Sequence, residues 1–120
     1  MQYLVDMKLA DSTRSKLPQD GLNLIEQFVL PTLALCKKAK EEGRIVAGGP
    51  VGGAVRLALI VEASSIRDLD DFVESLPLWA IMETTVIPLT TFDGRAQSLG
   101  PTVERLKRLI AQMASGGPRS

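Results

Sequence analysis

Three charged residues, Asp6, Arg56 and Glu83, lie inside segments that are largely apolar and β-prone. A charged group in an apolar setting must be paired, hydrogen-bonded or shifted in pKa, so each is either a structural ion-pair partner or a working acid or base. As a catalytic set, a partly desolvated carboxylate would take a proton from carbon while Arg56 or backbone N–H groups stabilise the enolate oxygen. As a structural set, they would form an ion-pair network at a buried interface.

The remaining composition limits the possible chemistry. The chain has no histidine, and Cys36 is its only cysteine. We therefore expect no Ser-His or Cys-His triad, no internal disulfide, and no zinc or haem site of the usual kind. Cys36 falls on an apolar helical stripe, which predicts a buried structural thiol rather than a reactive one. The groups left for chemistry are carboxylates, Lys, Arg, Tyr3, hydroxyls and backbone amides.

The charge balance narrows the class of protein. Fourteen basic residues match fourteen acidic ones in 120 residues, without a basic stripe interleaved with aromatics, so we expect no nucleic-acid partner. Asp6 and Lys8 interrupt the only early apolar run, which argues against a signal peptide, and no run approaches the roughly 20 residues that span a bilayer. We expect a cytoplasmic protein without membrane contact.

Apolar periodicity predicts the element order βαββαβ. The stretch GGPVGG precedes a strand-like run, which favours a hairpin turn over a phosphate-binding loop. The expected elements are a strand at 2–9, a helix at 17–43 kinked near Pro31, strands at 44–47 and 54–63, a helix that Ser65 caps and Pro77 stops, and a strand at 79–87.

This order predicts a ferredoxin-like α+β fold, in which four antiparallel strands carry both helices on one face. The strands are apolar on both alternating sets, so we expect the sheet of another subunit to cover the second face. The first and third strands would be central and the last would lie beside the first, which brings Asp6, Arg56 and Glu83 together if their faces coincide. We expect this domain at 1–89 and an extension at 90–120, with a turn-like TTFDGR and an amphipathic helix from Pro101.

Two segments carry a resemblance to a known family. The opening MQYLVDMKL and the stretch SLPLWAIMETTVIPL resemble the muconolactone Δ-isomerase family over roughly residues 1–89. The resemblance implies a dimeric α+β barrel that can assemble into rings of dimers. It also implies an isomerase of aromatic catabolism that moves a proton in an unsaturated lactone with no cofactor or metal. The family's Pro-Leu-aromatic segment, followed by Met and an acid, falls on Pro77, Leu78, Trp79, Met82 and Glu83.

This resemblance suggests a role for each candidate residue. Glu83 would act as base or acid, Arg56 would hold a carboxylate or enolate oxygen, and Asp6 would tune or share the proton. The predicted substrate contacts are Trp79, Met82 and Tyr3.

The chain also departs from the family pattern, and other functions stay open. It has Asp6 where the prototypes carry Lys, and Ile45 to Gly53 lack their basic, aromatic and histidine residues. The alternatives on the same fold are a non-catalytic protein for small-molecule binding or assembly, and a cofactor-free monooxygenase.

Overall fold

A computed structural model describes residues 1–10 and 17–116 of the chain. The chain divides into two compact units, Met1–Leu89 and Thr90–Ser120. The first unit contains β1 (Gln2–Leu9), α1 (Pro18–Leu24), the π-helical turn η2 (Ile25–Val29), α2 (Leu30–Glu41), β2 (Ile45–Pro50), β3 (Arg56–Glu62), α3 (Ile66–Glu74), the 3-10 helix η3 (Pro77–Ile81) and β4 (Met82–Leu89). The second unit contains α4 (Phe92–Gly116).

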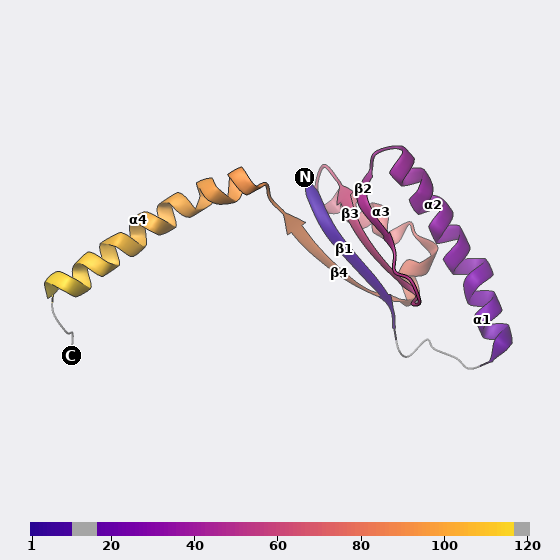
Figure 1. Ribbon diagram of the computed structural model, residues 1–120. Coiled ribbons are helices and arrows are strands. Elements are labelled where there is room, and N and C mark those ends of the chain that lie inside the picture. Colours follow the sequence, from indigo (N-terminus) through magenta and orange to yellow (C-terminus); the bar gives the residue numbers. More distant parts are fainter. Residues whose placement is uncertain (11–16, 117–120) are drawn as a thin grey trace. The chain divides into compact units, whose positions relative to one another are not determined.

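The four strands form one sheet in the order β2-β3-β1-β4, with antiparallel neighbours throughout (Figure 1). Strands β1 and β3 are central, and β4 lies beside β1. This arrangement confirms the predicted ferredoxin-like topology.

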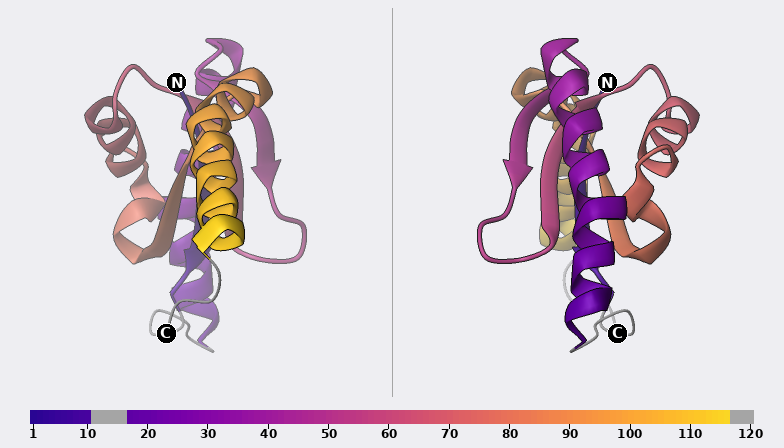
Figure 2. Two further views of the ribbon diagram at one scale, coloured as in Figure 1. Left: turned by 90° about the vertical axis from the view of Figure 1, so that its left-hand side faces the viewer. Right: turned by 90° about the vertical axis from the view of Figure 1, so that its right-hand side faces the viewer.

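One face of the sheet holds the hydrophobic core. Successive strand residues point to opposite faces, so Tyr3, Val5 and Met7 share a face and are all buried. Helices α2 and α3 cover this face, contributing buried residues such as Cys36 and Leu69 (Figure 2). The thiol of Cys36 is therefore buried, as the sequence predicts.

The opposite face carries the alternate set of residues. Leu4, Ala58 and Ile60 are only partly buried, and Ile87 is exposed. Within the described part of Met1–Leu89, both helices lie on the other side of the sheet (Figure 2). This face therefore combines apolar residues with solvent exposure in a single chain.

The long first helix contains a π-helical turn. The expected disturbance near Pro31 takes the form of η2, which separates α1 from α2, with Pro31 at the start of α2. Proline has no N–H to donate and its ring clashes with the preceding turn, so a local change of hydrogen bonding there is expected.

The β2–β3 hairpin extends further than the sequence indicated. Strand β2 includes Gly48, Gly49 and Pro50, and only the rest of the glycine-rich stretch forms the turn. Gly48 has φ +95°, and a Cβ built on it would lie 2.1 Å from the carbonyl oxygen of Ala58. Glycine is therefore required there for both backbone angle and close approach.

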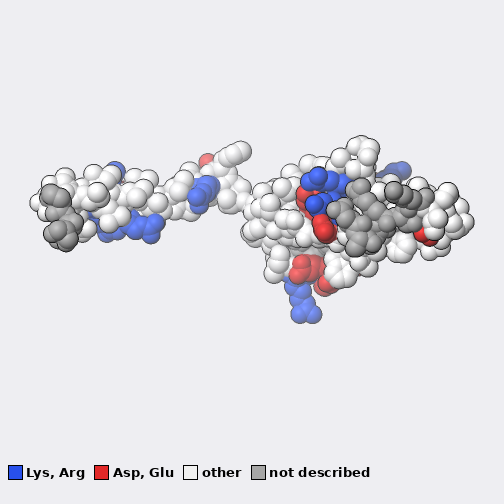
Figure 3. Space-filling view, turned by 90° about the horizontal axis from the view of Figure 1, so that it is seen from below, with Lys and Arg blue, Asp and Glu red and all other residues white. Residues whose placement is uncertain are grey.

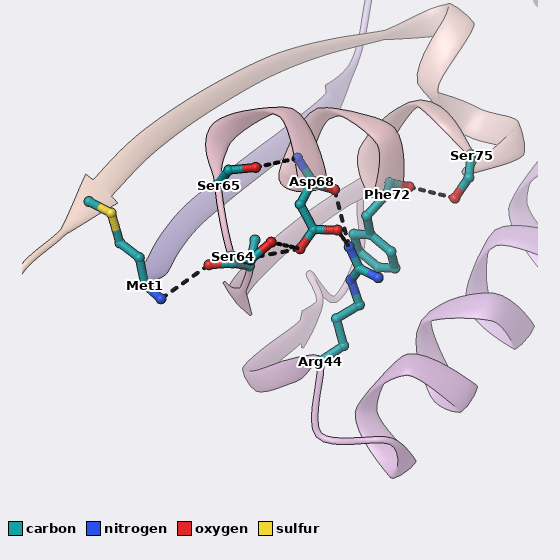
Figure 4. A network of polar contacts seen from close by, with 8 residues as sticks. Met1, Arg44, Ser64, Ser65, Asp68, Phe72 and Ser75 are labelled. Atoms are coloured by element: carbon teal, nitrogen blue, oxygen red, sulfur yellow. Dashed lines mark hydrogen bonds and ion pairs between the residues drawn. The ribbon is translucent and has the colours of Figure 1, made fainter.

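A polar network holds the start of α3 against Arg44, the residue before β2 (Figure 4). The Ser65 hydroxyl accepts a hydrogen bond from the Asp68 N–H, which confirms the predicted cap. The Asp68 carboxylate accepts from Arg44 Nη2 at 2.7 Å and from the Ser64 N–H at 3.0 Å. The Arg44 guanidinium also stacks on the Phe72 ring, 4.8 Å from its centroid.

The segment that precedes the last strand differs from the prediction. Trp79 lies in η3, and β4 begins at Met82 rather than at Trp79. Pro77 favours the start of this short helix, and the buried Thr32 hydroxyl fixes it by accepting a hydrogen bond from the Leu78 N–H at 3.0 Å. A contact between residues 46 positions apart overrides the local strand pattern.

Helix α4 begins nine residues before the predicted start at Pro101, so the expected turn at TTFDGR is wrong. The Thr91 hydroxyl accepts a hydrogen bond from the Gly94 N–H at 2.9 Å and caps the helix, and Asp93 suits its first turn. Pro101 lies inside the helix instead of starting it.

Candidate functional site

A row of charged side chains crosses the open face of the sheet. Lys8 on β1 lies directly opposite Arg56 on β3 and opposite Glu83 on β4. Asp6 lies two residues along β1 on the same face. The strand register therefore places Asp6, Arg56 and Glu83 on one face, which the sequence left open, with Lys8 between Arg56 and Glu83. We call these four residues the charged row.

The charged row forms two ion pairs rather than one network. Arg56 donates from Nε to Asp6 Oδ1 at 2.9 Å and from Nη2 to Asp6 Oδ2 at 2.7 Å. Glu83 instead pairs with Lys8, with 3.5 Å between Oε2 and Nζ. Sequence reasoning did not assign Lys8 a role, although it belongs to the same alternate set as Asp6.

The two carboxylates have different electrostatic settings. The hydrogen bond from Arg56 lowers the pKa of Asp6 below its usual range, with smaller favourable contributions from the charges of Arg56 and Lys8. Asp6 is therefore a firmly ionised partner of Arg56. The Glu83 side chain is 60% exposed, and among residues 1–10 and 17–116 its cation contact is the longer one to Lys8. Of the two carboxylates in the charged row, Glu83 is the one that can contact a ligand without breaking a bidentate ion pair.

The three predicted substrate contacts do not lie on this row. Tyr3 is buried on the helix-covered face, where its hydroxyl donates to Met1 Sδ at 3.5 Å. Met82 packs against the same core. Trp79 lies in η3 and its side chain is exposed. In a single chain, Tyr3 and Met82 therefore pack under the helices while the charged row lies on the other side of the sheet.

A separate pocket of about 310 Å³ lies between α2 and strands β2 and β3. Its apolar walls include Leu33, Ile45 and Leu57, and none of the described residues that line it is a carboxylate. Lys37 and Lys40, three residues apart on α2, provide its cationic groups. The sequence does not predict this pocket, because the pocket depends on how α2 crosses the hairpin.

Cys36 also lines this pocket. Burial raises the pKa of its thiol, so the protonated, unreactive form prevails near neutral pH. This residue contributes an apolar wall rather than a nucleophile.

Residues 1–10 and 17–116 contain no group of three or more His, Cys, Asp or Glu side chains placed to hold a metal ion. No helix in these same ranges has both the length and the apolar character needed to cross a membrane.

The four-stranded antiparallel sheet, with two helices on one face and a charged row on the other, defines a ferredoxin-like α+β protein. Residues 1–94 match the family model described as muconolactone delta-isomerase. The chain therefore belongs to the muconolactone delta-isomerase family, as its opening and its SLPLWAIMETTVIPL segment predict. No match was found among curated proteins.

Two solved structures resemble the fold. A crystal structure of muconolactone isomerase aligns with a TM-score of 0.58 and 22% identity, covering 76% of this chain and 90% of that one. A 5-chloro-2-hydroxyhydroquinone dehydrochlorinase from Burkholderia phenoliruptrix, in complex with 2,5-dihydroxybenzoquinone, aligns with a TM-score of 0.56 and 23% identity, covering 78% of this chain and 98% of that one.

Proposed function

We propose that this protein is a cofactor-free isomerase that moves a proton within a small unsaturated lactone or related organic acid of aromatic catabolism. The observation that carries the proposal is the charged row, in which Glu83 has a long contact to Lys8 while Asp6 is held by two hydrogen bonds from Arg56. Membership of the isomerase family supports this choice of reaction.

The chemistry suggested by the two similar structures has a common first step. Shifting a double bond in a lactone requires removal of a proton from carbon, and eliminating hydrogen chloride from a chlorinated ring also removes a proton. Both steps place negative charge on an oxygen conjugated with the reacting carbon. A carboxylate base beside fixed cations is suited to this chemistry.

Each member of the charged row has a place in this reaction. The Glu83 carboxylate takes the proton from the ring carbon and returns it to the conjugated carbon, so no atom is gained or lost. Arg56 uses Nε and Nη2 for Asp6, which leaves Nη1 to donate to the enolate oxygen or to a substrate carboxylate. Asp6 acts as a positioning residue because its two hydrogen bonds orient the guanidinium.

The site requires a cover, because Glu83 is 60% exposed in a single chain. The apolar residues around the row, such as Leu4, Ile60 and Ile87, make a second copy of the sheet the natural cover, and self-association is part of the proposal. Trp79 remains the predicted aromatic contact at the entrance to β4.

The test is conversion of muconolactone by purified protein, followed by proton NMR. Glu83→Gln removes the base and is expected to lower kcat by about 100-fold or more, the typical contribution of a general base. Glu74→Gln is the control, since Glu74 is an exposed acid at the end of α3, away from the sheet face. Equal conversion by Glu83→Gln and wild-type protein would overturn the proposal.

The pocket favours a second candidate, a binding protein for small apolar anions. Its walls are apolar and its cations are Lys37 and Lys40, and its described lining residues include no carboxylate that could act as a base. Binding of muconolactone, which carries a carboxylate, would follow from this arrangement without any reaction.

Isothermal titration with muconolactone distinguishes the two sites. The variant Lys37→Gln with Lys40→Gln is expected to lose binding if the pocket holds the ligand. Lys38→Gln is the matched control, because Lys38 lies on the same helix but pairs with Glu42 and does not line the pocket. The opposite result would be weaker binding in Glu83→Gln or Arg56→Gln and unchanged binding in the Lys37→Gln, Lys40→Gln double variant. That result would place the ligand on the charged row.

A further inference from the structure

Helix α4 carries an apolar seam with the spacing of a coiled coil. Its members recur at alternating intervals of three and four residues, which corresponds to positions a and d of a heptad repeat. The d positions hold Phe92, Leu99, Leu106 and Met113, and the a positions hold Ala96, Val103 and Ile110.

The large side chains of this seam are exposed. Phe92 is 98% exposed and Met113 is 73% exposed, and the members between them are uncovered as well. An isolated helix in water gains little stability without packing of its apolar face, and Gly94, Gly100 and Pro101 weaken this one further. The helix therefore needs a partner surface.

The residues that weaken α4 all lie off the seam. Counting from Phe92 at position d, Gly94 and Pro101 fall at position f, the outermost of the heptad, and Gly100 falls at e. The sequence thus keeps a continuous a/d seam from Phe92 to Met113 in spite of a proline and two glycines. A seam that stays continuous in spite of these residues indicates that α4 is suited to pairing with another helix more than to stability on its own.

The identity of the core residues indicates what kind of partner fits. Val103 and Ile110 are β-branched at a, and Leu106 occupies d between them, the combination that favours parallel two-stranded coiled coils. In a second copy with the same register, each of these residues would pack against the same residue of the other chain. The paired side chains would therefore match in size.

The charges agree with the same arrangement. In a parallel pair, position g of one helix faces position e of the next heptad on the other helix. Arg95 would face Gly100 of the second copy, and Thr102 would face Lys107 of the second copy, so no like charges meet. The basic side chains of α4 alternate with uncharged surface along the helix (Figure 3).

We propose that α4 of one chain pairs with α4 of a second copy as a parallel, in-register coiled coil. The match to the isomerase family ends at residue 94, so most of this seam lies outside the family domain. The pairing of α4 does not rest on the proposed function.

Disulfide trapping of the full chain tests the proposal. In a Cys36→Ala background, Leu99→Cys and Met113→Cys place thiols at two d positions 14 residues apart. The controls Ser98→Cys and Gln112→Cys move each thiol by one residue, to position c. A parallel coil brings like d positions within the roughly 4 Å between Cβ atoms that a disulfide needs, so both d variants are expected to form linked dimers about tenfold faster than both controls.

A second comparison ties the linkage to the seam. Adding Ile110→Glu to the Leu99→Cys chain is expected to abolish the faster linkage, whereas adding Gln112→Glu, the same charge two residues away, is expected to preserve it. Equal linkage at c and d positions, or no linkage at either d position, would overturn the proposal. Linkage seen only when Leu99→Cys chains are mixed with Ile110→Cys chains, which pairs a d position with an a position, would show antiparallel pairing and would equally overturn it.

Discussion

Asp6 and Arg56 are joined by two hydrogen bonds across the central strand pair, at 2.9 and 2.7 Å. This bidentate pair removes Asp6 from the list of available bases and fixes the plane of the guanidinium. Glu83, on the same face, is left with Lys8. Because Asp6 and Glu83 pair with different cations, we assign the two carboxylates different roles.

Replacing Arg56 should change the titration of Asp6. Because Arg56 lowers the pKa of Asp6, carbon-detected NMR of the folded protein is expected to show a carboxyl midpoint below the ordinary value of 3.8. In Arg56→Gln the midpoint should rise toward 3.8. Arg67→Gln, an exposed arginine on α3, should leave it unchanged. An Asp6 midpoint that is the same in Arg56→Gln and wild-type protein would show that the pair does not form in solution.

The network around Asp68 should make stability depend on pH. The Ser64 N–H, and then Arg44, lower the pKa of Asp68 in the folded chain. A carboxyl with a depressed folded pKa stabilises the fold above its unfolded pKa, and this stabilisation is lost as pH falls through the folded value. Asp68→Asn is therefore expected to lower Tm at pH 7, with a difference from wild type that shrinks below about pH 4.

Asp70→Asn on the same helix serves as the control for Asp68→Asn, because Asp70 is exposed. Thermal unfolding at a series of pH values measures both variants. A Tm difference for Asp68→Asn that stays constant from pH 7 to pH 3 would contradict the assignment of the network to the ionised carboxyl.

Gly48 and Gly49 should respond very differently to alanine. Gly48→Ala places a side chain at a positive φ, which costs about 1–2 kcal/mol, and drives the new Cβ into the Ala58 carbonyl. A loss of that size lowers Tm by roughly 4–8 °C per kcal/mol in a domain of this length. Gly49→Ala meets no atom within 4 Å and has no positive φ, so its Tm should stay close to that of wild type. Similar Tm values for the two variants would count against the described hairpin.

Thr32 and Thr84 provide a matched pair in the core. Thr32→Val removes the acceptor of the buried Leu78 N–H and is expected to cost about 1–3 kcal/mol of unfolding free energy. The Thr84 hydroxyl is buried without a hydrogen-bond partner among the described residues, so Thr84→Val should not destabilise the protein. Urea unfolding measures both, and a larger loss for Thr84→Val than for Thr32→Val would contradict these contacts.

The sequence predicts the topology and part of the site well. Alternation on each strand, together with the fixed order of strands in a split βαβ sheet, was sufficient to put Asp6, Arg56 and Glu83 on neighbouring strands. The register that aligns these charged residues on one face follows from the burial of Tyr3, Val5 and Met7 on the opposite face. A shift of the pairing by one residue would expose the apolar residues and bury the charged ones.

Other features depend on contacts that local patterns do not encode. The 3-10 helix at Trp79 is tied to Thr32 on α2, and the pocket depends on how Lys37 and Lys40 lie over the hairpin. The pairing of Glu83 with Lys8 depends on register rather than on residue type. Pro101 gave a misleading signal because proline favours helix starts but can also occur inside a helix.

The most direct test of the central claim is solvent deuterium incorporation into muconolactone, measured by proton NMR in deuterated buffer. This measurement detects the proton transfer itself, even when the equilibrium between lactone isomers hides net conversion. Wild-type protein is expected to exchange a ring-carbon proton for deuterium. The Glu83→Gln variant is expected to remain folded and to exchange that proton at least about 100-fold more slowly. Exchange that persists in Glu83→Gln, or that is absent from wild-type protein, would contradict the assignment of Glu83 as the base.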